Sequence, residues 1–303
     1  MSIEVDFARC DPCYSEGETV TGNVIVKTNC EFKFNCVNAT LFGTVALIDD
    51  PEFFPIINYS FQILKSNDSL NKFGNNSQIP FSFTLKSLHP NSTPLLETYY
   101  GSKIKIQYFL RFEIKKAGVI SQSITKSLEI FIHQTVKDPL PPQKFSFLIT
   151  PESIARSSSI TSIYNLKDEM SIPNCRIYGT IDNTTNPLNK PIRGFIRIDQ
   201  CEEEIRSLEV RLMRAEFIPE GRKYTDNLFK DTSEIQNLQI CDGDIIKDLE
   251  VPIHMFLPRN FSCSSLKIDE VPFQIGFELH IIIVFKNNYV ILEKIPLKLW
   301  RSK

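Results

Sequence analysis

The chain has 303 residues, with 34 Lys and Arg against 36 Asp and Glu, and a formal net charge of −2 at pH 7. This balance argues against a general nucleic-acid-binding protein, which is normally basic. The length suits one large or two medium domains, and no apolar run reaches the roughly 20 residues that span a bilayer. Because Glu4 and Asp6 stand where a signal peptide would have its apolar core, we expect a cytoplasmic protein with reduced cysteines.

Alternating strands are predicted along the first half of the chain. Gly22 is followed by Val24 and Val26, residues 37–41 alternate between apolar and polar side chains, and residues 104–114 carry an apolar side chain at every second position. A period of two is typical of a strand with one buried face. Such strands need a second layer to cover them, which favours a β-sandwich.

A proline cluster at residues 139–142 divides the chain, since prolines cannot lie inside a sheet ladder. The predicted domains are residues 1–140 and 145–303. The strand signals of the first half return in the second at an offset of about 170 residues, in the same order. The matched sets are Gly22, Val24 and Val26 with Gly194, Ile196 and Ile198; Val37, Ala39 and Leu41 with Leu208, Val210 and Leu212; Ile79-Pro80-Phe81 with Val251-Pro252-Ile253; 106–110 with 275–279; and 128–132 with 295–299.

The sequence therefore predicts an all-β protein built from a duplicated sandwich, without a long amphipathic helix. Residues 281–285 are apolar on both faces and are predicted to lie in a central strand. Three irregular segments are predicted: residues 67–78 as a surface loop, residues 155–170 as a mobile insertion near the start of the second domain, and residues 217–233 as another long loop.

Catalytic and metal-binding signals are weak. The four histidines have no partner at a recognised catalytic or metal spacing. Cys10-Asp-Pro-Cys13, with Cys30 and Cys36 downstream, could serve zinc or redox chemistry, but residues 30–36 alternate as a hairpin would, and we favour no metal. Asp242-Gly243-Asp244 lacks the other oxygen ligands of a calcium loop and is better explained by a tight hairpin turn. We predict a binding scaffold, not an enzyme, with no cofactor.

Several motifs carry a family resemblance. Glu97-Thr-Tyr99 and Gly101, leading into Tyr108-Phe-Leu-Arg111, resemble the signature strand of the arrestin-like subunits of retromer and its relatives, the vacuolar protein sorting 26 family. Residues 234–244, followed by Val251-Pro-Ile and Phe256-Leu-Pro-Arg259, are similar to the C-type members, which belong to the Retriever complex. The 155–170 segment departs from the family pattern, so contacts there are not carried over.

The resemblance implies an arrestin-like fold of two tandem β-sandwich domains. It implies a non-catalytic subunit of a trimer that recycles cargo from endosomes, cytoplasmic and peripheral on the endosomal membrane. The implied partners are a large α-solenoid subunit, a metallophosphoesterase-like scaffold and a sorting nexin, and no nucleic acid. In the family a second-domain hairpin docks on the solenoid. The matching residues are Leu238, Ile240, Cys241, Asp242 and Gly243, and we expect Ile240 and Cys241 to be exposed at its tip.

Other interpretations stay open at this point. The chain could be a subunit of retromer itself, or Ile240 could face the core. An arrestin-related adaptor that recruits ubiquitin ligases would carry Pro-Pro-x-Tyr motifs, whereas Pro141-Pro-Gln-Lys144 has no Tyr. An enzyme with an unrecognised site is a residual alternative. Co-purification would separate these classes, because a solenoid partner favours the trimer and a ligase favours the adaptor.

Overall fold

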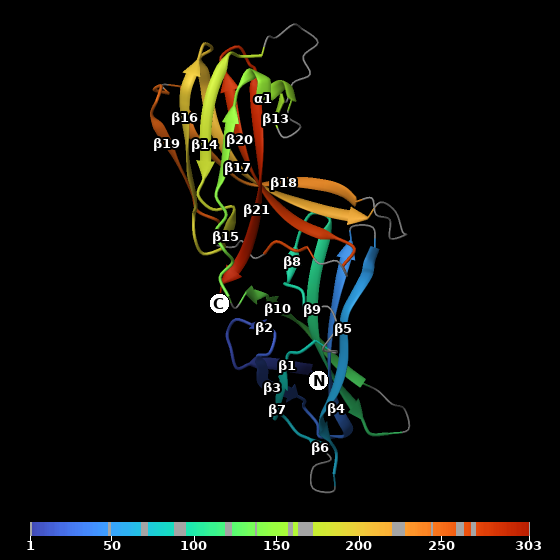
Figure 1. The fold of residues 1–303 in the computed structure, drawn as a ribbon. Coiled ribbons are helices and arrows are strands. Elements are labelled where there is room, and N and C mark those ends of the chain that lie inside the picture. The colour runs from blue at the N-terminus through green and yellow to red at the C-terminus, as the bar shows by residue number, and fades with distance from the viewer. Residues whose placement is uncertain are drawn as a thin grey trace. The chain divides into compact units, whose positions relative to one another are not determined.

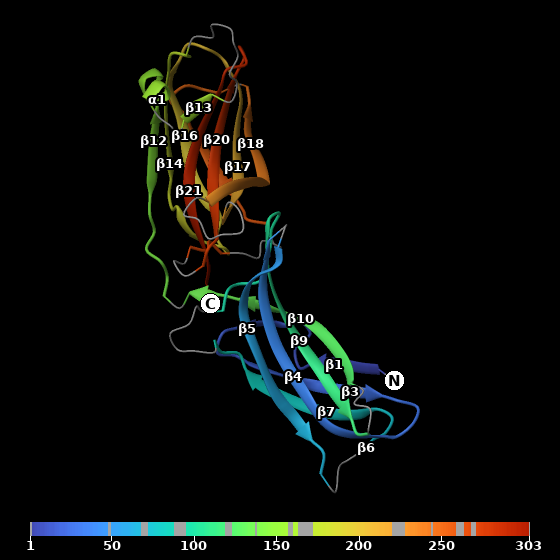
Figure 2. The same ribbon diagram turned by 90° about the vertical axis from the view of Figure 1, so that its right-hand side faces the viewer.

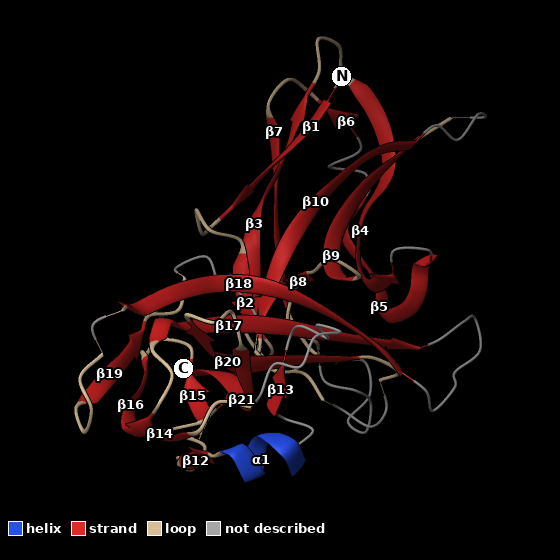
Figure 3. Ribbon diagram, turned by 90° about the horizontal axis from the view of Figure 1, so that it is seen from above, coloured by secondary structure: helices blue, strands red, loops and turns tan. Residues whose placement is uncertain are grey.

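The computed structural model describes residues 2–47, 50–67, 72–87, 95–118, 123–136, 138–156, 160–162, 172–219, 228–243, 245–258, 264–267 and 271–302, without the side chains of 51–54 and 160–162. The chain divides into two compact units, Met1–Gln134 and Thr135–Lys303. Within the described residues nearly all regular structure is β-strand, and the one helix, α1, is short, at Pro151–Arg156 (Figures 1 and 3).

The first unit contains two sheets (Figure 2). The smaller has the strand order β1 (Ser2–Phe7), β3 (Thr19–Lys27) and β7 (Ser77–Thr84). The larger has the order β2 (Cys13–Ser15), β10 (Ser123–His133), β9 (Ile104–Lys116), β4 (Phe32–Leu47) and β5 (Asp50–Lys65). Two short strands join this larger sheet, β6 (Lys72–Phe73) on β4 and β8 (Tyr99–Tyr100) on β9.

The second unit repeats this plan. Its smaller sheet has the order β12 (Phe145–Ile149), β14 (Cys175–Ile181), β16 (Ile192–Cys201) and β19 (Glu250–Met255). Its larger sheet has the order β11 (Thr135–Val136), β21 (Val290–Ser302), β20 (Gln274–Phe285), β17 (Ile205–Pro219) and β18 (Leu228–Asp242). Two further short strands, β13 (Ile160–Ser162) and β15 (Thr185–Pro187), pair with β21.

The predicted repeat is confirmed strand by strand. β4, β9 and β10 of the first large sheet occupy the same relative places as β17, β20 and β21 of the second, and in each sheet a short edge strand, β2 or β11, runs parallel to its neighbour. The two matched prolines, Pro80 and Pro252, lie in the edge strands β7 and β19, where a missing N–H does not interrupt a ladder.

The repeated glycines have a shared physical cause. A Cβ placed on Gly22 would lie 2.3 Å from the main-chain oxygen of Asp6 in β1, and one on Gly194 would lie 2.1 Å from the main-chain oxygen of Thr180 in β14. No side chain fits at such a close approach of two backbones. The glycine therefore belongs to the strand pairing of each small sheet and marks the same place in both units.

Burial follows the predicted alternation. Six side chains of β9, those of Ile104, Ile106, Tyr108, Leu110, Phe112 and Ile114, are at most 1 % exposed, whereas the side chains between them reach solvent. Residues 281–285 are buried on both faces of the central strand β20, as predicted. The Tyr108 hydroxyl donates a hydrogen bond to the Leu96 carbonyl at 2.8 Å, which satisfies the polar end of this large buried ring.

Two of the predicted irregular segments are wrong in part. Residues 217–219 end β17 and residues 228–233 begin β18, so only 220–227 of that predicted loop fall outside the described residues. The error arose because β18 is an edge strand whose polar side chains do not mark a buried face. Residues 72–73 of the predicted 67–78 loop form β6, and residues 77–78 begin β7.

The segments at 30–36 and 155–170 also differ from expectation. Residues 32–36 belong to the start of β4 and form no hairpin, although the pairing of β4 with β9 shifts register between Phe34 and Cys36. Residues 155–156 close α1, residues 160–162 form β13 on β21, and the rest of the predicted 155–170 insertion lies outside the described residues.

Ile106→Asp should unfold the first unit. The side chain is 1 % exposed, so the carboxylate would be buried without a partner, at a cost of several kcal/mol against a typical total stability of roughly 5–15 kcal/mol. Lys105→Asp is the matched control, because Lys105 is the exposed neighbour on the same strand. Thermal melting should show a large loss for the first variant and little change for the second. Equal melting would mean that the two faces of β9 are assigned the wrong way round.

The domain limits 1–140 and 145–303 are kept as a proposal that fragments can test. Residues Thr135 and Val136 pair with β21, and the Gln143 carbonyl accepts a hydrogen bond from the Thr184 N–H at 2.7 Å. A fragment of residues 145–303 should therefore fold by itself, and the addition of residues 135–144 should raise its melting temperature. A fragment of residues 145–303 that fails to fold would overturn the proposed limit.

Candidate partner-binding site

Four of the five predicted site residues lie at the end of β18, the edge strand of the second large sheet, and the fifth, Gly243, follows it directly. Leu238 and Cys241 pair with Val210 and Leu208, two fully buried residues of β17. Ile240 falls at a β-bulge, because Leu208 and its successor Glu209 pair with residues on either side of it. Leu238, Ile240 and Cys241 are half-buried, so the expectation that Ile240 and Cys241 are exposed is wrong. The partial burial of Cys241 follows from its pairing with the buried residue Leu208.

The turn after β18 is not a hairpin. β18 pairs with β17, whereas β19, the next strand, pairs with β16 in the other sheet. The prediction of a tight hairpin after β18 is therefore wrong, since the chain crosses from the end of β18 at Asp242 to β19 in the other sheet. Gly243 has a φ of +73°, a conformation that glycine adopts without strain.

The crossover carries apolar side chains that sequence reasoning missed. Ile246 is 66 % exposed and Leu249 is 52 % exposed. One exposed aliphatic residue is normal on a protein surface, but two within four residues on one connection suggest a contact surface. The sequence feature that could have indicated these exposed residues is Ile245-Ile246 directly after Asp242-Gly-Asp244, in a segment too short to be a strand.

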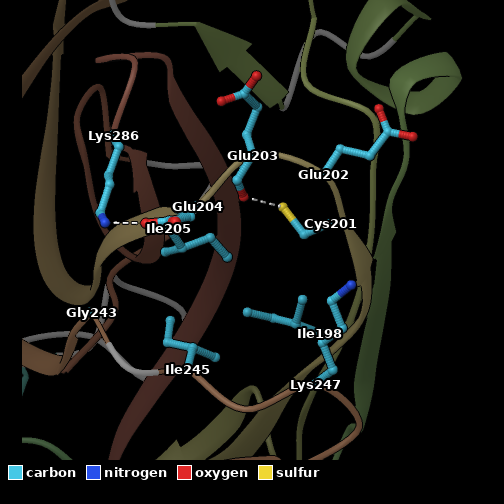
Figure 4. Close-up of a pocket in the computed structure, with 10 residues that line it drawn as sticks. All are labelled: Ile198, Cys201, Glu202, Glu203, Glu204, Ile205, Gly243, Ile245, Lys247 and Lys286. Atoms are coloured by element: carbon cyan, nitrogen blue, oxygen red, sulfur yellow. Dashed lines mark hydrogen bonds and ion pairs between the residues drawn. The ribbon is translucent and has the colours of Figure 1, made fainter.

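A recess of about 410 Å³ lies beside this crossover (Figure 4). Its lining comes from the end of β16, the β16–β17 turn, the crossover and the β20–β21 turn: Ile198, Cys201, Glu202, Glu203, Glu204, Ile205, Gly243, Ile245, Lys247 and Lys286. Figure 4 shows the isoleucine side chains Ile198, Ile205 and Ile245 gathered in the interior of the recess, with glutamates and lysines around them.

Main-chain hydrogen bonds hold the walls of the recess together. The Gly243 N–H donates to the Arg206 carbonyl at 2.7 Å, and the Asp248 N–H donates to the Ile198 carbonyl at 2.9 Å. The Lys286 N–H donates to the Glu204 carbonyl at 2.8 Å. Each bond joins segments far apart in the sequence, so the recess has a framework that does not depend on its side chains.

The rim of the recess is acidic on balance. Three exposed glutamates, residues 202–204, stand against two exposed lysines, Lys247 and Lys286. Lys286 and Glu204 form an ion pair, but both side chains are more than 60 % exposed, so the pair adds little to stability. An apolar interior with a charged rim is the usual form of a protein-binding surface.

The chemistry of the recess favours binding over catalysis. The Cys201 thiol donates to the Glu203 carbonyl at 2.8 Å, and burial raises the pKa of this thiol. A thiol with a raised pKa is a poor nucleophile at neutral pH. Over the described parts of the chain, no group of three or more His, Cys, Asp or Glu side chains is arranged to hold a metal ion. Among the same residues, no helix is long and apolar enough to cross a membrane.

Two tandem β-sandwiches whose large sheets share one strand order define an arrestin-like protein. The sequence matches the family Vps26, vacuolar protein sorting-associated protein 26, over residues 4–288, and the chain belongs to this family. The predicted fold class and the predicted family are both confirmed.

Three relatives illustrate the match. The chain is 27 % identical over 316 residues to vacuolar protein sorting-associated protein 26C of Dictyostelium discoideum, covering 99 % of both proteins. It is 23 % identical to vacuolar protein sorting-associated protein 26 of Caenorhabditis elegans, covering 95 % of this chain and 72 % of the relative. It is 21 % identical to the protein of the same name from Plasmodium falciparum, covering 96 % and 87 %.

Purified protein should contain no stoichiometric zinc. The sequence motif at Cys10 and Cys13 lacks, in the described residues, the further ligands that a tetrahedral site needs. Chelation should therefore leave the melting temperature unchanged. One zinc ion per chain by elemental analysis would contradict this expectation.

Proposed function

We propose that this chain is the non-catalytic arrestin-like subunit of a Retriever-like trimer that recycles membrane cargo from endosomes. Membership of the Vps26 family makes it a vacuolar protein sorting protein. The finer assignment is supported by end-to-end similarity to a 26C protein. Its partners in this proposal are an α-solenoid subunit, a metallophosphoesterase-like scaffold and a sorting nexin, with peripheral attachment to the endosomal membrane from the cytoplasm.

The solenoid subunit docks, in this proposal, on the end of the second domain where β18 gives way to β19. The observation that carries this assignment is the pair of exposed aliphatic residues, Ile246 and Leu249, beside an acid-rimmed recess. Buried apolar anchors surrounded by polar groups supply most of the affinity of a typical interface. Of the predicted residues, Leu238, Ile240, Cys241 and Asp242 end β18 and lead to Gly243, which lines the recess itself.

The half-burial of Ile240 and Cys241 changes their role in this proposal. Both residues are partly covered at the end of β18, where Cys241 pairs with Leu208 of β17 and so helps to orient the crossover, while Ile246 and Leu249 make the apolar contact with the partner. A charge at Ile240 or Cys241 would disturb this support as well as the contact. Substitutions at the two exposed positions test binding more cleanly.

Co-purification from a cell lysate, followed by mass spectrometry, tests the assignment as a whole. Recovery of a solenoid subunit with a metallophosphoesterase-like scaffold supports the Retriever-like trimer. A retromer solenoid would place the chain in retromer itself, a ubiquitin ligase would favour the arrestin-related adaptor, and recovery of none of these would overturn the proposal.

Replacing Ile246 and Leu249 together by serine should weaken binding to the solenoid at least tenfold, or about 1.4 kcal/mol, because two apolar anchors are lost. The melting temperature should barely change, since exposed substitutions usually alter stability by no more than about 0.5 kcal/mol. Calorimetric titration and thermal melting of the same preparation measure both quantities.

Phe256→Ser is the matched control. Phe256 is likewise exposed, at 65 %, but it lies directly after β19, at the end of that strand that is farther from the recess. Its loss should leave solenoid binding unchanged. Equal loss of affinity in the control and the double variant would mean that the partner recognises another surface of the domain.

A further inference from the structure

The fold brings together a thiol and an imidazole that lie 120 residues apart in the sequence. The Cys13 sulfur is 3.0 Å from Nδ1 of His133, in a partly buried position. Cys13 belongs to the Cys10-Asp-Pro-Cys13 motif, which the partner-binding site leaves unexplained. The described residues offer this motif no metal-binding cluster, so the contact with His133 gives it a different chemical meaning.

The contact follows from the edge of the first large sheet. β2 runs parallel to β10, and Cys13 pairs with Phe131. His133 is two residues beyond Phe131, so its side chain lies on the same sheet face as that of Cys13. The Phe131 N–H donates to the Pro12 carbonyl at 2.9 Å, and this bond fixes the start of β2 against β10.

A second group holds the cysteine main chain in place. The Arg9 guanidinium donates to the Cys13 carbonyl at 3.0 Å and pairs with Glu18 at 3.1 Å. Glu18 in turn accepts a hydrogen bond from the Ser15 N–H at 2.9 Å. Both ends of the three-residue strand are thus tied to one ion pair, so the thiol is presented to the imidazole in a defined position.

A thiolate, not a thiol, is the nucleophile of cysteine chemistry, and an adjacent imidazole is a base that removes its proton. We propose that Cys13 is a redox-modification site activated by His133, with hydrogen peroxide and related hydroperoxides as the reacting class. His133 Nδ1 takes the thiol proton, and the sulfur attacks one peroxide oxygen. The S–O bond forms as the O–O bond breaks, and the departing hydroxide, or the alkoxide of an organic hydroperoxide, takes the proton from the His133 imidazolium and leaves as water or alcohol. The product is a sulfenic acid at Cys13.

Modification at this position acts on an edge strand. Three residue pairs join β2 to β10, and the contact between the Cys13 thiol and the His133 imidazole is a side-chain link between the same two strands. A sulfenic acid is larger and more polar than a thiol, so it displaces this contact. Oxidation therefore weakens the pairing of β2 at the edge of the first sandwich.

The reduced wild-type chain tests the proposal without any substitution. Brief treatment with iodoacetamide at about pH 6.5, where ordinary thiols are almost wholly protonated, is followed by peptide mass spectrometry of every cysteine. Cys13 should be alkylated roughly tenfold faster than Cys10 and Cys30, although both of these are more exposed. After limiting hydrogen peroxide, a sulfenic-acid trap should be found on Cys13 first. Equal or slower labelling of Cys13 would overturn the proposal.

Substitution of the histidine isolates its role. His133→Gln keeps a polar side chain but removes the base, so the labelling rate of Cys13 should fall to that of Cys10 and Cys30. His254→Gln is the matched control, since His254 is exposed on β19 in the other unit and contacts Phe256. If Cys13 keeps its fast labelling in His133→Gln, the imidazole does not activate it and the proposal fails.

Discussion

In each unit the two central strands of the large sheet must bury one face of side chains against a second sheet, and the rest of the fold depends on this burial. β4 with β9, and β17 with β20, are paired over nearly their whole lengths. Because side chains alternate with a period of two, a slip of one residue in either pair would turn the whole apolar set outward. Register is therefore strongly fixed at the centre of each sandwich.

This central register also fixes what meets at the sandwich ends. β16 and β19 belong to the small sheet of the second unit, and β17, β18 and β20 belong to the large one. The turn after β16, the crossover after β18 and the turn after β20 all emerge at one end, where they line the recess (Figure 4). Loops positioned by a rigid sheet scaffold are common places for binding residues. The surface at Ile246 and Leu249 is in this sense a product of the strand pairing.

The sequence was most informative where burial or close backbone packing restricts the residue types that a strand can carry. The alternation of residues 104–114, the doubly apolar run 281–285 and the duplicated glycines could all be read directly, because each reflects a local rule of burial or backbone approach. The edge strand β18 was partly missed, since its polar residues give no such signal. The exposure of Ile246 could not be predicted from its residue type, because apolar residues occur both in the core and on the surface of folded proteins.

Contacts between distant residues were the least predictable. Nothing in the spacing of Cys13 and His133 indicates that they touch, since the contact depends on the parallel pairing of a three-residue strand. The family resemblance supplied the location of the candidate binding surface. It did not predict that Ile240 is half-buried and lies at a bulge in β18. Sequence periodicity thus predicts sheets well and predicts side-chain encounters across them poorly.

The recess is framed by main-chain hydrogen bonds from Gly243 to Arg206, from Asp248 to Ile198 and from Lys286 to Glu204. Peptide groups make these bonds whatever side chain each position carries. Substitutions around the rim can therefore accumulate over evolution without loss of the fold, and new charge patterns can be tried at low cost to stability. The framework of the recess therefore does not require the same rim side chains in relatives that share only 21–27 % of their residues with this chain.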